Sequence, residues 1–285
     1  MRFAKAHGLG NDFLLVDAEH VPEAAAPWAR RLCDRHRGVG ADGILAYVLR
    51  DGGIGMRLIN ADGSDAEISG NGVRCLAAWA FAQGWLPASH VVFTAAGPRH
   101  VVVEQRGWHA YSVATDLGAP RLGSDEIPCR IEPPRPLVLG HPLGALGRRV
   151  EVTATSLGNP HCAVFTREPP DDAEVALLGP ALESHAFFPQ RTNVEFVTVT
   201  SRGELRVRFW ERGVGPTSAS GTGAASAAVA AMLHGLVDRS VRVVCDGGVL
   251  EVEWPEDGHV SQVGEVELLF EGEWLTEVAT EPGTP

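Results

Sequence analysis

The segment Ser220-Gly221-Thr222-Gly223 opens an apolar stretch of Ala, Val, Met and Leu that runs to about Leu233. A strand-like run from Leu205 to Trp210 precedes it, so the sequence predicts a strand, a glycine-rich loop and a helix. The same arrangement occurs 151 residues earlier, where Ser69-Gly70-Asn71-Gly72 opens a second apolar stretch. A repeat of about half the chain indicates two copies of one domain, because solenoid repeats span only about 20–50 residues.

The repeat extends beyond these loops. Gly84 and Gly235 follow the two predicted helices at the same offset, and Leu9-Gly10-Asn11 has a counterpart in Leu157-Gly158-Asn159. We therefore expect two pseudo-symmetric α/β domains, 1–120 and 121–265, with a C-terminal strand at about 266–285 that returns to the first. Six prolines between positions 120 and 142 predict a loop or linker at this boundary.

Each predicted loop lies at a helix N-terminus, which offers unpaired N–H groups and the positive end of the helix dipole. Glycine allows a ligand to approach the backbone closely, so such a site suits a carboxylate or a phosphate. Two pseudo-symmetric sites could face one small anion from both sides. The alternative is that each Gly-X-Gly segment is only a tight turn.

Composition excludes several classes of protein. The net charge of −12 argues against nucleic acid or an anionic membrane as the main partner. Lys5 is the only lysine, so no glycine-rich segment contains a phosphate-loop lysine, and Lys5 alone could form a Schiff base with pyridoxal phosphate. The five cysteines are unclustered, which indicates reduced thiols and a cytoplasmic protein, and no metal-ligand spacing appears. No apolar run reaches the roughly 18 residues of a membrane span.

The segment from Gly38 to Gly43 matches the dinucleotide-binding pattern G-x-G-x-x-G. That pattern requires a preceding strand and a following helix. Here a predicted helix and a basic turn precede it, and the run from Ile44 to Val48 predicts a strand. We therefore reject a dinucleotide site.

Eight motifs in order resemble the diaminopimelate epimerase family over nearly the whole chain. They are His7-Gly-Leu-Gly-Asn-Asp-Phe13, Gly38-Val-Gly-Ala-Asp42, Asn60-Ala-Asp-Gly-Ser64, Gly70-Asn-Gly-Val-Arg-Cys75, Gly158-Asn-Pro-His161, Arg191-Thr-Asn-Val-Glu-Phe196, Glu211-Arg-Gly-Val-Gly215 and Gly221-Thr-Gly223. The resemblance implies two domains, each a curved, mostly antiparallel sheet around a central helix, with the active site in the cleft between them. It also implies a homodimer that interconverts L,L- and meso-diaminopimelate by two-base proton transfer without a cofactor, in bacterial lysine biosynthesis.

The resemblance further implies roles for individual residues. Ser69 and Ser220 occupy the positions of the family's two catalytic cysteines, and His161 and Glu211 are candidate catalytic neighbours. The α-carboxylate of the substrate is expected on the N–H groups of the two helix N-termini, and polar side chains are expected to hold the distal end. The candidate substrate-binding residues are Asn11, Asn60, Gly70, Asn71, Asn159, Asn193, Glu211, Arg212, Gly221 and Thr222.

Three positions depart from the family pattern. Both proton-carrying cysteines are serines, and Pro216 stands where the family usually has Glu. A thiol titrates near about 8.5 and lower still at a helix N-terminus, whereas a hydroxyl is far less acidic. We therefore expect impaired turnover.

Three interpretations of the double serine are open. The chain is an epimerase whose cysteines were replaced to trap substrate, a natural relative with another reaction, such as an amino-acid racemase or hydroxyproline dehydratase, or a non-catalytic amino-acid-binding protein. The retained substrate-end residues favour diaminopimelate as the ligand in the first and third interpretations.

Overall fold

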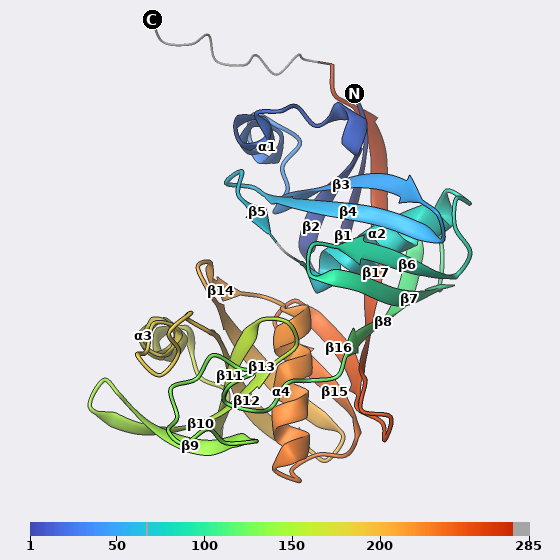
Figure 1. Ribbon diagram of the computed structural model, residues 1–285. Helices are drawn as coiled ribbons and strands as arrows, with labels where there is room; N and C mark the ends of the chain where they lie inside the picture. The colour runs from blue at the N-terminus through green and yellow to red at the C-terminus, as the bar shows by residue number, and fades with distance from the viewer. Residues whose placement is uncertain (67, 276–285) are drawn as a thin grey trace, which may run out of the picture. The chain divides into compact units, whose positions relative to one another are not determined.

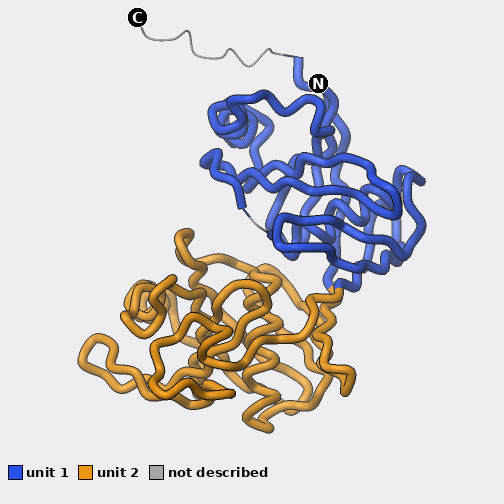
Figure 2. The backbone as a smooth tube through the Cα atoms, viewed as in Figure 1, with its two compact units in different colours: residues 1–115, 264–285 blue, residues 116–263 orange. Residues whose placement is uncertain are grey.

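A computed structural model describes residues 1–66 and 68–275 of the chain (Figure 1). Two compact units divide it (Figure 2). Unit 1 contains Met1–Thr115 and the chain from Gly264 onward, and unit 2 contains Asp116–Val263. The last residues of the predicted C-terminal strand, 276–285, lie outside the described residues.

Unit 1 is a sheet wrapped around one helix. Its elements are β1 (Arg2–Gly8), β2 (Asn11–Asp17), the 3₁₀ helix η1 (Ala18–His20), α1 (Ala25–Cys33), β3 (Gly43–Arg50), β4 (Gly53–Asn60), β5 (Asp65–Ala66), α2 (Gly70–Ala82), β6 (Ser89–Thr94), β7 (Gly97–Gln105) and β8 (Ala110–Gly118), which continues into unit 2. The β2–β3 and β4–β6 pairs are parallel, and the other pairs among β1 to β8 are antiparallel. A later strand, β17 (Val260–Glu273), pairs with both β1 and β8. The series of paired strands therefore closes on itself around α2.

After one extra strand, unit 2 repeats the order of strands and α-helices in unit 1. Its elements are β9 (Val138–Ala145), β10 (Arg148–Ser156), β11 (Pro160–Thr166), α3 (Asp172–Glu183), β12 (Asn193–Ser201), β13 (Glu204–Glu211), β14 (Gly215–Thr217), α4 (Gly221–Leu233), β15 (Ser240–Cys245), β16 (Gly248–Glu253) and the first part of β17. The parallel pairs are β11–β12 and β13–β15, the counterparts of those in unit 1. The far end of β17 pairs with β1, from Glu267 to Glu273.

The two central helices are buried on all sides. Every residue from Gly70 to Ala80 in α2, and from Gly221 to Ala231 in α4, is buried. A helix that is apolar all round belongs in a core, and its small Gly and Ala side chains allow strands to pack closely. Helix α2 contacts β1, β2, β3, β4, β6 and β7, and α4 contacts their counterparts β10, β11, β12, β13, β15 and β16.

Both central helices also end in the same way. Gly84 and Gly235 follow the last turn with φ angles of 69° and 67°, in the left-handed region that favours glycine. The next residue, Trp85 or Leu236, donates its backbone N–H to the carbonyl of Ala80 or Ala231. The repeat predicted from the sequence is therefore structural at both ends of each helix.

The prediction of an α/β fold with a mostly antiparallel sheet around each central helix is confirmed. Two details differ from the sequence-based expectation. The proline-rich segment is not loop throughout, since β9 begins at Val138 and includes Pro142. The C-terminal strand expected from about residue 266 begins earlier, at Val260, and is the single strand β17.

Candidate active site

Each central helix begins with a serine as its N-cap. Ser69 has φ −131° and ψ 124°, and Ser220 has φ −134° and ψ 123°. The Ser69 hydroxyl accepts a hydrogen bond from the N–H of Gly72 at 3.1 Å, and the Ser220 hydroxyl accepts one from Gly223 at 3.3 Å. The first intrahelical bonds come from the fourth residues after the N-caps, so the N–H groups of Gly70, Asn71, Gly221 and Thr222 precede the helical ladder. Each unit therefore has a serine-capped helix N-terminus at the centre of its own candidate residues.

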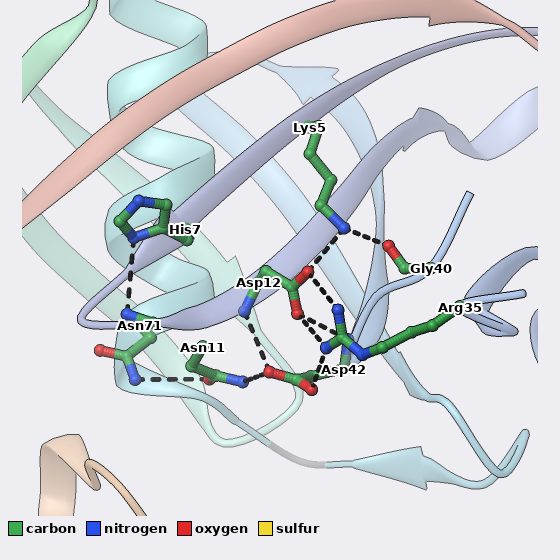
Figure 3. A network of polar contacts seen from close by, with 9 residues as sticks. Lys5, His7, Asn11, Asp12, Arg35, Gly40, Asp42 and Asn71 are labelled. Atoms are coloured by element: carbon green, nitrogen blue, oxygen red, sulfur yellow. Dashed lines mark hydrogen bonds and ion pairs between the residues drawn. The ribbon is translucent and has the colours of Figure 1, made fainter. Parts of the chain in front are cut away.

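In unit 1 a polar chain leads to the N-terminus of α2 (Figure 3). The Asn11 amide donates to the Asp42 carboxylate at 2.9 Å, and its carbonyl accepts from the Asn71 amide at 3.3 Å. The Arg74 guanidinium donates to the side-chain oxygen of Asn71. A carboxylate can only accept, so Asp42 fixes the orientation of the Asn11 amide.

Two cations stabilise the carboxylates behind Asn11. Lys5 lies 2.6 Å from the Asp12 carboxylate and also donates to the carbonyl of Gly40. Arg35 binds Asp12 at 2.7 Å and Asp42 at 2.8 Å. Burial raises the pKa of Asp12, but hydrogen bonds from Arg35 and Lys5 outweigh it and hold the pKa well below the ordinary value of 3.8. The only lysine is therefore part of an ion-pair network.

The G-x-G-x-x-G segment supplies Gly40 and Asp42 to this network. It lies between α1 and β3, so a helix precedes it and a strand follows it. This order is the reverse of the one required for dinucleotide binding. Asn60 makes a different contact from Asn11 and Asn71. It is the last residue of β4, and its side-chain amide donates to the Ser64 hydroxyl at 3.0 Å.

In unit 2 a second polar chain leads to the N-terminus of α4. Nδ1 of His161 lies 2.7 Å from the Glu195 carboxylate, and Nε2 lies 2.9 Å from the carbonyl oxygen of Asn159. The Asn159 amide donates to the Thr222 hydroxyl at 3.4 Å. Thr222 and Asn71 are each the second residue after their N-cap. Burial raises the pKa of Glu195, although the charge of His161 and its hydrogen bond act in the opposite direction.

Ser220 has an ionisable neighbour in Glu211, one of the candidate catalytic residues. Glu211 accepts a hydrogen bond from the Thr217 hydroxyl at 2.6 Å. Burial raises the pKa of Glu211, whereas the bond from Thr217, the charge of His161 and a bond from Ser220 lower it. A buried carboxyl group with a raised pKa beside the N-cap is a candidate proton-transfer group.

Asn193 and Arg212 form a separate pair in unit 2. The side-chain oxygen of Asn193 accepts a hydrogen bond from the backbone N–H of Arg212 at 2.9 Å. The side-chain amide of Asn193 donates to the backbone carbonyl of Pro160 at 3.0 Å. The half-buried Arg212 side chain donates to the carbonyl of Gln190 at 3.2 Å. Asn193 therefore holds the turn that carries Arg212.

The five cysteines form no disulfide within the described residues, and buried thiols do not replace the missing proton carriers. Burial raises the pKa of Cys75 to about 12 and that of Cys162 well above 9.0. A buried thiol with a raised pKa is inert. The serines at the helix N-termini therefore remain the candidate proton carriers.

No group of His, Cys, Asp and Glu side chains within 1–66 and 68–275 is arranged to hold a metal ion. Over the same part of the chain, every helix is too short or too polar to cross a bilayer.

Solved structures share the fold. A predicted epimerase from Pseudomonas aeruginosa superposes with a TM-score of 0.69 at 17% identity, covering 97% of this chain and 99% of that one. A hydroxyproline epimerase from Agrobacterium vitis, solved with bound trans-4-hydroxy-L-proline, gives a TM-score of 0.68 at 14% identity over 95% and 90% of the two chains. At these identities the likeness defines the fold alone.

Sequence relatives define the family. The diaminopimelate epimerase family model matches residues 3–123 and 153–269. Diaminopimelate epimerases of Pelotomaculum thermopropionicum and Desulforudis audaxviator are 45% and 46% identical, each over 96% of this chain and 99% of their own length. This chain belongs to the diaminopimelate epimerase family, a family of isomerases.

Proposed function

We propose that this protein binds diaminopimelate and interconverts its L,L and meso forms by proton transfer at the α-carbon, with turnover limited by its two serines. Family membership and the matched serine N-caps carry the proposal. The two caps stand where the family pattern has the proton carriers, one in each unit.

The remaining site residues have proposed roles in the same reaction. The N–H groups of the two helix N-termini hold the α-carboxylate, since such groups bind anions. Glu211 accepts a proton from Ser220, and His161 assists proton transfer. The distal end of the ligand is held by Asn11, Asn60, Asn159, Asn193 and Arg212, with Arg212 as a fork for the distal carboxylate.

We propose that the working form is a cytoplasmic homodimer whose functional domains are 1–120 and 121–265, with the C-terminal strand added to the first. Cysteines that form no disulfide within the described residues fit a reducing compartment. Sedimentation equilibrium tests the dimer. A monomer at all concentrations would contradict this part of the proposal without affecting the proposed ligand.

Calorimetric titration with diaminopimelate tests the proposed ligand directly. We expect saturable binding of the L,L and meso isomers and much weaker binding of lysine, which has no distal carboxylate for Arg212. Arg212→Lys is a suitable variant, because lysine keeps the charge but not the planar fork. It should weaken diaminopimelate binding by about tenfold or more. Equal binding of lysine, or no binding of diaminopimelate, would reject the assignment.

A further inference from the structure

Glu195 is a buried acid for which the proposed reaction has no use. We propose that Glu195 is a positioning residue: it accepts the Nδ1–H of His161 and so holds the ring with Nε2 turned toward Asn159 at the N-terminus of α4. The geometry of unit 2 carries this claim, and only its expected effect on ligand binding rests on the proposed function.

The hydrogen-bond geometry fixes the orientation of the His161 ring. Nδ1 lies 2.7 Å from the Glu195 carboxyl group, and Nε2 lies 2.9 Å from the side-chain oxygen of Asn159. The Glu195 oxygen is an acceptor for the Nδ1–H. The side chains of Glu195 and His161 are each only 1% exposed, so water does not replace this bond. Losing it would leave a buried polar group unsatisfied.

His161 is the one side chain that bonds to Glu195 within the described residues. The backbone of Cys162 also contributes a hydrogen bond that lowers the pKa of Glu195. Burying a carboxyl group costs stability, and an apolar side chain at this position would avoid that cost.

Unit 1 shows how the same fold fills these positions without charges. Phe13 pairs with Gly43 across the parallel β2–β3 pair, as His161 pairs with Asn193 across β11–β12. Two residues after Gly43 and Asn193 come Leu45 and Glu195, respectively. Phe13 and Leu45 are 3% and 0% exposed and belong to the core around α2.

The apolar residues of unit 1 show that the fold itself does not need a charged pair at these positions. An apolar pair satisfies the architecture in unit 1, and replacing a buried ion pair by apolar residues of similar size is often neutral or stabilising. The pair in unit 2 therefore serves what it touches. Held by Glu195, the His161 ring places Nε2 against the side-chain oxygen of Asn159, whose amide nitrogen then faces the Thr222 hydroxyl.

Nitrogen-15 NMR of the histidine rings tests the protonation directly in the protein as it is. Signals of His161 are assigned by their absence in His161→Gln. We expect hydrogen on Nδ1 in the wild type, and a weaker Nδ1–H bond with faster hydrogen exchange in Glu195→Gln, which keeps size but accepts less strongly. Thr198→Val is the matched control: it removes a buried hydroxyl from β12, bonded to Thr166 at 2.8 Å, and should leave the His161 signals unchanged. No hydrogen on Nδ1 in the wild type, or no change in Glu195→Gln, overturns the proposal.

The double variant His161→Phe/Glu195→Leu tests whether the pair is structural. It installs the side chains of unit 1, so we expect its denaturant midpoint to equal or exceed that of the wild type. Glu195→Leu alone should unfold more easily, because it leaves a buried histidine without its hydrogen-bond acceptor. A double variant markedly less stable than the wild type would show that the pair maintains the fold, against the proposal.

Ligand binding then tests the link to function. In Glu195→Gln we expect diaminopimelate affinity to fall by about tenfold, with Thr198→Val unaffected. Unchanged affinity in Glu195→Gln, beside an altered His161 ring, would refute positioning of the ligand site. If the wild type binds no diaminopimelate, the proposed function fails, and the NMR and stability measurements alone decide the role of Glu195.

Discussion

At the residue scale, the site in unit 1 depends on a balanced cluster of two cations and two carboxylates. Lys5 and Arg35 bind Asp12, and Arg35 also binds Asp42, which orients Asn11. The Lys5 side chain is 7% exposed and that of Asp12 is 13% exposed, so this pair is largely desolvated. Removing one partner leaves the other charge buried and uncompensated.

Asp12 therefore makes stability depend on pH in the acid range. Its folded-state pKa lies below the ordinary value of 3.8, so the unfolded chain takes up a proton first as the pH falls. The contribution of Asp12 is complete above about pH 4 and is lost as the pH falls through the folded-state pKa. Asp12→Asn should lower the free energy of unfolding by about 2 kcal/mol at neutral pH, with a difference from the wild type that shrinks below about pH 4.

Urea unfolding of the wild type and Asp12→Asn between about pH 7 and pH 2 makes this measurement. Asp65→Asn is the matched control, because Asp65 makes a two-bond ion pair with Arg57 on the exposed surface. Its effect should stay below about 1 kcal/mol. A constant gap between the wild type and Asp12→Asn over the whole pH range would contradict the account.

At the element scale, each serine has a structural role as a cap in addition to its proposed chemical role. The hydroxyls of Ser69 and Ser220 satisfy N–H groups of α2 and α4 that have no partner within the helix. A thiol is a much weaker hydrogen-bond acceptor. Restoring cysteine at these positions should therefore favour the reaction while weakening the helix starts.

Alanine at either N-cap measures this role. Ser69→Ala and Ser220→Ala should each lower the free energy of unfolding by about 1 kcal/mol. Ser226→Ala is the control on α4, since the Ser226 hydroxyl is buried without a hydrogen-bond partner among the described residues and its removal should be neutral or stabilising. Equal effects of Ser220→Ala and Ser226→Ala in denaturant titrations would show that the caps contribute nothing.

At the scale of the whole molecule, the internal repeat made the fold predictable. The 151-residue offset between Ser69 and Ser220 placed both central helices, because glycine loops and capped helix starts are local signals. The expected C-terminal strand is part of β17, but the start of β17 at Val260 was missed, because its two halves pair with different strands, β16 and β1, and no local pattern reports that.

The site was predictable only in part. Motifs located Asn11, Asn159 and His161, which the structure joins to the helix N-termini. Glu195 was missed as a partner of His161 because the two are 34 residues apart in sequence and meet only across the parallel β11–β12 pair. Within the apolar run of β12, nothing in the sequence alone distinguishes a buried acid from an exposed one.

The central claim is that serine at the two N-caps limits an otherwise intact epimerase site. Its most direct test is the rate of α-hydrogen exchange of diaminopimelate in heavy water, followed by chiral analysis of the product. We predict slow or undetectable exchange by the wild type and a gain of several powers of ten in Ser69→Cys/Ser220→Cys, because each proton-transfer group contributes about 10²–10⁴-fold. Each single variant should gain far less, because the two faces of the carbon each need a carrier. Fast exchange by the unchanged protein, or no gain in a double variant that still binds diaminopimelate, would contradict the claim.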